Sequence, residues 1–349
     1  MLSRDIPQSV AAFGFVLALS GVGMLSHLRA DRNEAPKSLL SGAWQAGYED
    51  AFEAANPLET VAINALGALR YALFQQGSEG VLVGREGWLF TAEEFETSPN
   101  FTAQIESSAD YVADVVDTLK ALGIEVLPVL VPDKSEMYPQ HLRHKRPQQV
   151  TERRAHFQSA LRARGISALD ATLALMTVAK TGNAFMRTDT HWSPHGSRNV
   201  ADTVARYVAS SGLLTAGTTQ VTTTKTGILP FDGDLIGFVP TGALRPVIGP
   251  PPESLMHYET TVESSLGLFD APDVPVVLVG TSFSARSEFH FEGFLQQALQ
   301  SDVINFAREG TGPFAPMERF LASDTVTNSP PQLVIWEIPL RYVSKDLLP

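Results

Sequence analysis

The order of apolar and polar stretches along the chain predicts an α/β protein. Short, nearly continuous apolar runs alternate with longer stretches in which apolar residues recur every three or four positions, the pattern of an amphipathic helix. The predicted strands are 125–131, 166–170, 274–279, 303–306 and 332–338, and the predicted helices are 103–122, 150–164, one that opens at 194, and 292–300. This alternation favours a mostly parallel sheet with helices on both faces, a three-layer α/β/α fold.

The N-terminal stretch has a different pattern. Residues 9–28 form an apolar run without a formal charge. As a helix this run would span about 30 Å, the thickness of a bilayer core. We interpret it as a transmembrane anchor or an uncleaved signal, with residues 1–8 as a short cytoplasmic N-terminus before it. A cleavable signal peptide and a buried helix of a soluble domain are the alternatives.

Residues 29–78 are predicted to be a linker and a helical lead-in. The first part, 29–37, is charged and typical of a linker beside a membrane. Two helices are expected after it, at 39–55 and 58–74. They are separated by Asn56-Pro57, a pair that favours a helix break followed by a new cap.

Residues 79–349 are predicted to form the main domain. They begin with a hairpin signal, in which two short apolar strands flank a turn at 84–87. One stretch, about 215–270, departs from the alternation because it is rich in Thr, Gly and Pro, and it contains the acidic segment 231–235. We interpret it as an insertion that lies over the site and shapes a substrate groove; a loop without a role in function is the alternative.

Composition narrows the class of protein. The 349 residues are 44% hydrophobic and 18% charged, which is typical of a folded chain with ample material for a core. The net charge of −12 argues against nucleic acid as a partner, because neutralising phosphates requires a basic face. The lack of cysteine excludes a disulfide framework, and it fits either a reducing compartment or an exported bacterial protein.

Two short segments carry the candidate chemistry, Asp189-x-His191 and the serine in Gly280-Thr281-Ser282. A serine hydroxyl becomes a good nucleophile when an imidazole takes its proton and a carboxylate orients that imidazole. In an extended stretch Asp189 and His191 project from the same face. Ser282 follows a predicted strand, at the edge where open α/β sheets build their sites.

The segment around His191 also admits a second interpretation. Ser193-Pro194 predicts an N-cap and a first helical residue, so His191 should lie at the mouth of a helix. Asp189, His191 and His195 are the candidate ligands of the alternative, a metal site. Because the cap places His191 before the helix and His195 inside it, the two imidazoles need not converge, and no metal site is predicted.

Five segments in this order along the chain point to one family. They are 81–90, 131–135 with Tyr138-Pro139, 189–192, 280–284 and 334–337. Together they cover about residues 45–345. Through them the chain resembles the alginate O-acetyltransferase proteins of Gram-negative bacteria, whose exported domains look like SGNH hydrolases. The apolar N-terminal run resembles the membrane-tethered branch of that family.

The resemblance implies an SGNH-like fold and a triad of Ser282, His191 and Asp189 that needs no cofactor. It implies acetylation of sugar hydroxyls of an exopolysaccharide through an acetyl-serine, with the acetyl group relayed from a membrane-bound O-acyltransferase. The catalytic domain would face the periplasm from the inner membrane. Two alternatives stay open, a polysaccharide acetyl esterase and a non-catalytic scaffold of a synthase complex, because a triad does not report which oxygen acts as the second nucleophile.

The resemblance leaves the oxyanion donors open. SGNH enzymes usually supply an Asn, and no Asn matches by motif here. The segment 307–312 occupies roughly that place, so Arg308 and the backbone N–H of Gly310 are candidate donors. Lys134 and Trp192, in two of the matching segments, are further candidates for oxyanion or substrate binding.

Overall fold

The computed structural model describes residues 8–30, 43–214, 219–263 and 275–348. By its contacts the chain divides into two compact units, which are described separately below. The larger unit comprises residues 77–238 and 250–349, and the smaller comprises residues 1–76 and 239–249. Most of the predicted N-terminus (1–8) and of the charged linker (29–37) lies outside the described residues.

The smaller unit is helical in its described part. Its elements are α1 (Gln8–Arg29), α2 (Ala43–Ala54), α3 (Pro57–Phe74), η4 (Gly242–Leu244) and α9 (Arg245–Ile248). His27 Nδ1 lies 2.7 Å from Tyr48 Oη and links α1 to α2. The backbone of Pro240 packs against α3 so closely that a Cβ on Gly67 would lie 2.3 Å from the Pro240 carbonyl oxygen.

The predicted anchor, residues 9–28, forms helix α1. Among the helices of the described residues, none has both the length and the apolar character needed to cross a membrane, so the prediction of a spanning helix is not supported. Small and polar residues such as Ser20, Gly21 and His27 interrupt the apolar residues of α1 and are exposed.

The larger unit is built around a five-stranded sheet in the order β4-β3-β9-β7-β8, with every neighbouring pair parallel. Its strands are β3 (Glu125–Val131), β4 (Leu169–Asp170), β7 (Val276–Val279), β8 (Val303–Asn305) and β9 (Leu333–Pro339). A separate antiparallel pair, β1 (Val81–Val83) and β2 (Leu89–Thr91), is the predicted hairpin. β9 is buried along its whole length, as a strand covered on both faces should be.

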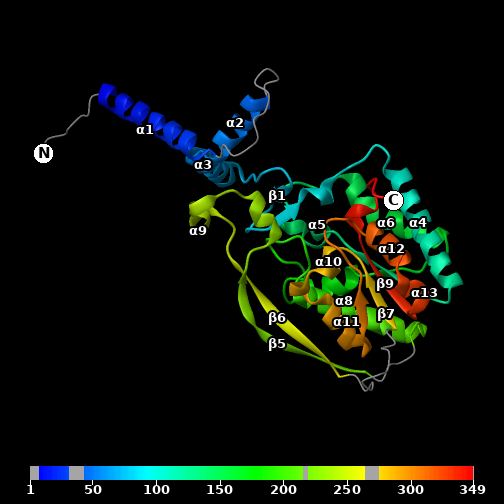
Figure 1. Cartoon of the computed structure of the whole chain (residues 1–349). Coiled ribbons are helices and arrows are strands. Elements are labelled where there is room, and N and C mark those ends of the chain that lie inside the picture. The colour runs from blue at the N-terminus through cyan, green and yellow to red at the C-terminus, as the bar shows by residue number, and fades with distance from the viewer. Residues whose placement is uncertain (1–7, 31–42, 215–218, 264–274, 349) are drawn as a thin grey trace. The chain divides into compact units, whose positions relative to one another are not determined.

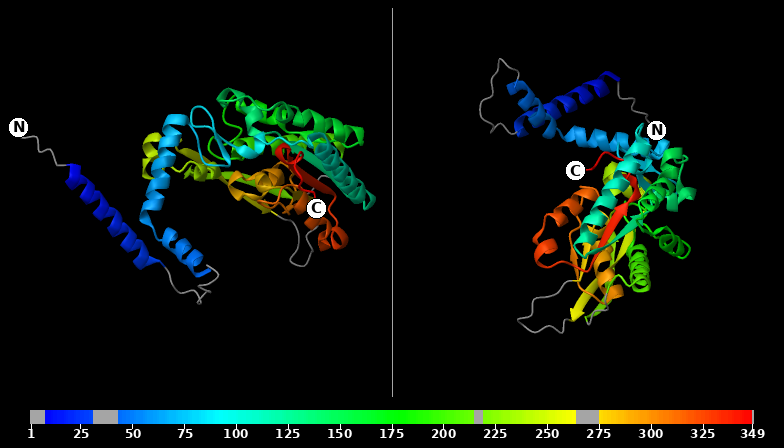
Figure 2. Two further views of the ribbon diagram at one scale, coloured as in Figure 1. Left: turned by 90° about the horizontal axis from the view of Figure 1, so that it is seen from above. Right: turned by 90° about the vertical axis from the view of Figure 1, so that its right-hand side faces the viewer.

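Helices cover both faces of this sheet (Figures 1 and 2). One face carries α7 (Thr172–Ala179), α8 (Pro194–Ser211), α10 (Ser282–Ala285) and α11 (Phe291–Leu299). The other carries α4 (Phe101–Ala121), α6 (Gln148–Ala163), α12 (Phe314–Leu321) and α13 (Asp324–Asn328). Successive residues of β7 alternate between the two faces: Leu278 packs with the first set of helices, and Val277 and Val279 with the second. The predicted α/β/α layering is therefore confirmed.

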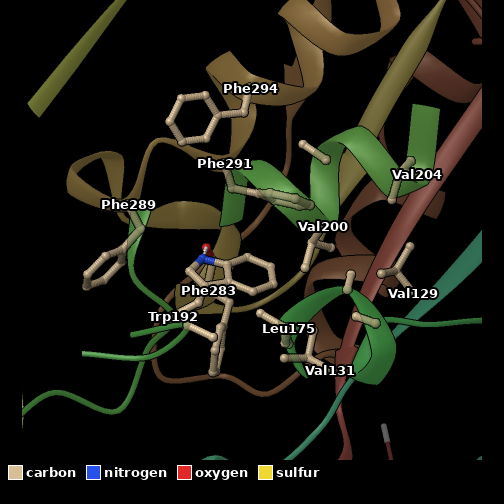
Figure 3. Close-up of a cluster of buried hydrophobic side chains, with 14 of the residues drawn as sticks. Val129, Val131, Leu175, Trp192, Val200, Val204, Phe283, Phe289, Phe291 and Phe294 are labelled. Atoms are coloured by element: carbon tan, nitrogen blue, oxygen red, sulfur yellow. Dashed lines mark hydrogen bonds between the residues drawn. The ribbon is translucent and has the colours of Figure 1, made fainter. Parts of the chain in front are cut away.

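Trp192 and Phe283 lie together in the core between the sheet and α11 (Figure 3). Their ring centroids are 5.0 Å apart with the planes almost perpendicular, and Trp192 Nε1 donates a hydrogen bond of 3.1 Å to the Phe283 carbonyl oxygen. Trp192 follows His191 in the sequence and Phe283 follows Ser282. This packing therefore fixes the segments of the candidate base and nucleophile relative to each other.

The insertion is a long antiparallel ribbon of β5 (Gln220–Phe231) and β6 (Glu253–Glu263). No strands were predicted here, because the ribbon is Thr-rich and largely exposed and lacks a clear alternation of apolar and polar residues. Its register sets Phe231 opposite Glu253, so the chain leaves and re-enters the ribbon at one end. Residues 215–218 and 264–270 of the predicted insertion lie outside the described residues.

Candidate active site

Ser282 lies where the sequence predicts it, at the carboxyl end of a strand of the parallel sheet. β7 ends at Val279, and Ser282 is the first residue of α10. The residue is half-buried, and its backbone N–H donates to no other residue in the described part of the chain. A hydroxyl accessible to substrate, beside an unpaired N–H donor, is the arrangement that acyl transfer requires.

Glu337 of β9 holds the turn that carries Ser282. The pairing of β7 with β9 sets Glu337 beside Gly280. Its Oε2 accepts hydrogen bonds from Thr281 N–H (2.7 Å), Thr281 Oγ1 (3.0 Å) and Ser284 Oγ (3.1 Å). A Cβ on Gly280 would lie 2.5 Å from that same oxygen, so a side chain at this position would displace the carboxylate.

A tight loop before α8 brings His191 to the serine. Met186 N–H donates to the His191 carbonyl oxygen at 3.0 Å, and Ser193 caps α8 with Pro194 as its first residue, as predicted. In this loop His191 Nε2 lies 2.7 Å from Ser282 Oγ. The imidazole is thus placed to take the serine proton.

Two phenylalanine rings hold the imidazole in place. The Phe289 ring stacks on it with centroids 5.1 Å apart, and the Phe283 ring contacts it edge-on at 4.8 Å. His191 is only 2% exposed. The imidazole therefore has little freedom to turn away from the serine.

Asp189 orients the imidazole from its other nitrogen. Asp189 Oδ1 lies 2.6 Å from His191 Nδ1 and also accepts the His191 backbone N–H at 2.9 Å. Its other oxygen, Oδ2, accepts the backbone N–H of Asp234 at 2.9 Å. When Nδ1–H donates a hydrogen bond to Asp189, Nε2 of the neutral imidazole is free to accept the proton of Ser282.

The carboxylates around His191 differ in their acidity. Burial alone would raise the pKa of Asp189, but the hydrogen bond and charge of His191 outweigh it and bring the pKa down to about 2. Burial, and then the negative charge of Asp189, raise the pKa of Asp234. Asp189 is therefore ionised at any pH at which the neutral imidazole could act as a base.

Three charged residues of this site were not predicted as site residues: Asp234, Arg286 and Glu337. Arg286 Nη1 lies 3.6 Å from Asp189 Oδ2 and 4.0 Å from Asp234 Oδ2. Each residue falls in or next to a segment that the sequence analysis singled out. No local spacing connects them to Asp189 or Ser282, because their contacts form only in the folded chain.

Lys134 and Trp192, predicted as oxyanion or substrate-binding candidates, serve the structure in another way. Both side chains are completely buried. Lys134 Nζ donates to the carbonyl oxygens of Leu89 (2.5 Å), Arg187 (2.9 Å) and Asp189 (2.8 Å), which occupies all three ammonium hydrogens. Lys134 therefore holds the loop that carries Asp189. The indole N–H of Trp192 donates to the Phe283 carbonyl oxygen and is not available to a substrate.

The loop after β8 carries the other two candidates, Arg308 and Gly310, and both are exposed. Arg308 N–H donates to the Gly280 carbonyl oxygen at 3.1 Å, so this loop runs beside the serine turn. Asn305 lies in the same region, but its amide group donates to the Ser284 carbonyl and to a carboxylate of α11, each at 2.9 Å. The oxyanion role of Arg308 and Gly310 stays a prediction.

The alternative metal site involved His195. In the structure His195 is exposed on α8, whereas Asp189 and His191 are buried. Within the described residues, the group that could hold an ion is Asp189, His191 and Asp234, with ligand atoms within 4.8 Å of one another. Both ring nitrogens of His191 already face partners, Asp189 and Ser282, which favours acid–base chemistry at this site.

Sheets of this kind build their sites at the carboxyl edge of the parallel strands, and here that edge holds a serine within reach of a histidine and a buried carboxylate. This combination, with Asp189 and His191 two residues apart in one loop, fits the SGNH hydrolase-like class. Comparison with protein families agrees: residues 81–340 match the model of the family described as "SGNH hydrolase-like domain, acetyltransferase AlgX". The chain belongs to this family.

The similarity extends beyond the five short segments. A protein named "Probable alginate O-acetylase AlgJ" from Pseudomonas syringae pv. tomato is 33% identical over 340 residues, which cover 96% of this chain and 87% of that protein. Its namesake from Pseudomonas fluorescens is 36% identical over 334 residues, covering 94% and 84%. The solved O-acetyltransferase domain of Pseudomonas putida AlgJ is 33% identical and superposes with a TM-score of 0.71, covering 76% of this chain and 93% of that domain.

The first prediction concerns Glu337. Burial raises the pKa of Glu337 to about 7, against the opposing effect of the hydrogen bonds from Thr281 and Ser284. The folded state therefore keeps this proton at a pH where the unfolded chain, with a pKa of about 4.3, has lost it. The free energy of unfolding should contain a component that falls as the pH rises from about 5 to about 7, with a slope of at most about 1.4 kcal/mol per pH unit.

Glu337→Gln should remove that component, and urea unfolding at several pH values measures it. Asp133, whose pKa burial also raises to about 6, is present in both proteins and cancels in the comparison. The matched control is Glu259→Gln, an exposed carboxylate on β6 that should leave the slope unchanged. An identical slope with and without Glu337 would contradict the assignment.

The second prediction separates the triad from a metal site. Prolonged treatment with EDTA should not reduce hydrolysis of a chromogenic acetyl ester, because a serine mechanism needs no Lewis acid. His195→Ala should change the rate by less than about twofold, as expected of an exposed position. His191→Ala should lower it by several orders of magnitude. Activity that is lost on chelation and restored by zinc would favour the metal site.

Proposed function

We propose that this protein is an exported O-acetyltransferase that acetylates hydroxyls of an alginate-like exopolysaccharide through an acetyl group on Ser282. The observation that carries this proposal is one chain of hydrogen bonds, from Ser282 Oγ to His191 Nε2 at 2.7 Å and from His191 Nδ1 to Asp189 Oδ1 at 2.6 Å. The substrate is inferred from the relatives, which are both named "Probable alginate O-acetylase AlgJ".

In the first step Ser282 Oγ attacks the carbonyl carbon of the acetyl donor. Its proton moves to His191 Nε2, and the ionised Asp189 stabilises the imidazolium that forms. As the bond between the acetyl carbon and the donor's leaving atom breaks, His191 gives the proton to that atom. An acetyl ester of Ser282 remains.

The second step runs in the reverse sense with a sugar hydroxyl. The sugar oxygen attacks the acetyl carbon while its proton moves to His191 Nε2. The bond to Ser282 Oγ then breaks, and the proton returns to the serine. Water in place of the sugar would release acetate, so an acetyl esterase is the second candidate function and differs only in which oxygen lies beside His191.

The charge that develops on the acetyl oxygen requires hydrogen-bond donors in both steps. The backbone N–H of Ser282 is the first donor in this proposal, because it belongs to the attacking residue and donates to no other described residue. Arg308 is the second candidate, since its loop is bonded to Gly280 beside the nucleophile.

The third prediction tests the covalent intermediate. Incubation with a chromogenic acetyl ester should add one acetyl group to the protein, located on Ser282 by mass analysis of its peptides. Ser282→Ala should abolish the adduct and lower ester cleavage by several orders of magnitude. Ser284→Ala should still form the adduct, because the Ser284 hydroxyl donates to Glu337 and not to His191.

Alginate oligosaccharides then distinguish the candidate functions. Transfer of the acetyl group from Ser282 to the oligosaccharide supports the transferase. Release of free acetate alone, at a rate that the oligosaccharide does not change, indicates an esterase. Failure of the unmodified protein to form any adduct favours a scaffold and overturns the proposal.

The location and the acetyl source are part of the same proposal. We place the catalytic domain on the periplasmic side of the inner membrane, with a membrane-bound O-acyltransferase as the donor. Support comes from the large apolar side chains exposed on α1, such as Phe13, Leu17 and Met24, which favour a lipid or protein surface over water.

The fourth prediction follows from that location. The full-length protein should fractionate with the inner membrane, and deletion of residues 1–30 behind a cleavable signal should release it into the periplasm. The released protein should cleave small acetyl esters as before but acetylate the polymer poorly in cells, because it is no longer held near its donor. Full polymer acetylation by the released form would count against a membrane-bound donor.

A further inference from the structure

The turn at 231–235, where the chain leaves the β5–β6 ribbon, has no part in the steps above. It lies against residues 187–190, the segment that leads to His191. Glu253, at the start of β6, joins the ribbon to the same segment, accepting hydrogen bonds from Arg187 N–H (2.7 Å) and Thr188 N–H (2.6 Å). Both ends of the excursion from the ribbon are therefore attached to the loop of the candidate base.

The turn approaches this loop backbone to backbone. A Cβ on Gly233 would lie 2.1 Å from the Thr188 carbonyl oxygen and 2.6 Å from Asp189 N, so no side chain fits there. Leu235 N–H donates to the Thr188 carbonyl oxygen at 3.2 Å, and Leu235 itself is buried. Asp234 lies between Gly233 and Leu235, so these close backbone contacts fix its position.

Asp234 contacts both members of the Asp189–His191 pair and also Thr190, which lies between them in the sequence. Its backbone N–H occupies Asp189 Oδ2, the oxygen that His191 does not use. Its carboxylate Oδ1 accepts Thr190 N–H at 2.8 Å and Thr190 Oγ1 at 3.2 Å, and its Oδ2 lies 3.7 Å from His191 Nδ1. A second carboxylate thus lies beside the imidazole.

Arg286 supplies the opposing charge. Its Nη1 lies between Asp189 and Asp234, at 3.6 and 4.0 Å, and its other nitrogens pair with Glu288. The guanidinium carbon lies 5.2 Å from the centre of the Phe289 ring, the ring that stacks on His191. With three carboxylates around it, Arg286 is suited to balancing charge at the site and unsuited to capturing an anionic substrate group.

We propose that Asp234 and Arg286 are positioning residues with opposite electrostatic effects on His191, and that the insertion places the first of them. The inference rests on the proposed function. Asp234 holds Thr190 and Asp189 in place and favours the protonated imidazole, whereas Arg286 favours the neutral imidazole that can act as a base.

The sign of each effect follows from the groups that face the imidazole. In the described part of the chain these are Asp189 from its own loop, Asp234 from the insertion, Ser282 from α10 and Arg286 from the segment after α10. The buried Lys134 ammonium lies behind them, 2.8 Å from the Asp189 carbonyl oxygen, and is present in every variant below. Without Arg286, the two carboxylates would hold a proton on the imidazole at higher pH and so remove the base. Arg286 offsets one of the two charges, and the base is then available at lower pH.

The test is the rate of acetyl-enzyme formation measured against pH in single turnovers. Arg286→Met keeps much of the side-chain stem but removes the charge. It should shift the midpoint of the acid limb of the profile to higher pH by about one unit. Asp234→Asn keeps an oxygen that can accept the hydrogen bonds of Thr190. It should shift the midpoint of the acid limb to lower pH by about one unit. The double variant should return the limb close to its original midpoint, and Arg286→Lys should leave it there.

Asp234→Ala separates position from charge. It should move the limb as Asp234→Asn does, and it should also lower the plateau rate without changing KM, because Thr190 loses its acceptor. The matched controls are Arg162→Ala and Glu259→Gln, exposed charges on α6 and β6, which should change neither limb nor plateau.

The outcomes distinguish this inference from the function on which it rests. If the unmodified protein forms no acetyl-serine, the proposed function fails. If it does, and Arg286→Met and Asp234→Asn lower the rate without moving the limb, the two residues are only structural and the inference is wrong. Should Arg286→Met not fold, the downward shift in Asp234→Asn and the unmoved limb in Arg286→Lys decide the question.

Discussion

The candidate active site depends on keeping one buried carboxylate charged. In a protein interior a carboxylate stays ionised only when donors or positive charges surround it. Asp189 is fully buried. His191 contacts its Oδ1, and the Asp234 backbone N–H and the Arg286 guanidinium contact its Oδ2. These groups come from three separate parts of the chain, so the loop before α8, the turn after β5 and the segment after α10 must all be in place before the imidazole has its partner.

A second buried carboxylate, Glu337, shows what changes when the donors differ. Glu337 is as buried as Asp189 and also accepts several hydrogen bonds. Its donors are a backbone amide and two hydroxyls, which are neutral. Their hydrogen bonds lower the pKa of Glu337 less than burial raises it, so the pKa is raised. The two residues accordingly have different effects: Asp189 holds a negative charge beside His191, the candidate base, and Glu337 fixes the turn that carries Ser282.

The features visible in the sequence are those set by local pattern. The apolar run at 332–338 is covered on both faces and so carries its own signal, and Ser193-Pro194 marks a helix start by residue type alone. The β5–β6 ribbon has no such signal because it is thin and largely exposed. Asp234, Arg286 and the structural use of Lys134 could not be predicted, since each acts through contacts between residues far apart in the chain. The predicted membrane span rests on the length of the run and its lack of charge, whereas the small and polar residues within α1 lower its apolar character, and no described helix is long and apolar enough to cross a membrane.

The distances in sequence between the partners have a consequence for folding. His191 and Ser282 are 91 residues apart, Asp189 and Asp234 are 45 apart, and Thr281 and Glu337 are 56 apart. Closing such loops has an entropic cost, which the packing of the core must offset. No short fragment of the chain contains Ser282, His191 and Asp189 together. The candidate triad therefore exists only where these distant segments are folded against one another, and it is lost wherever the sheet opens between them.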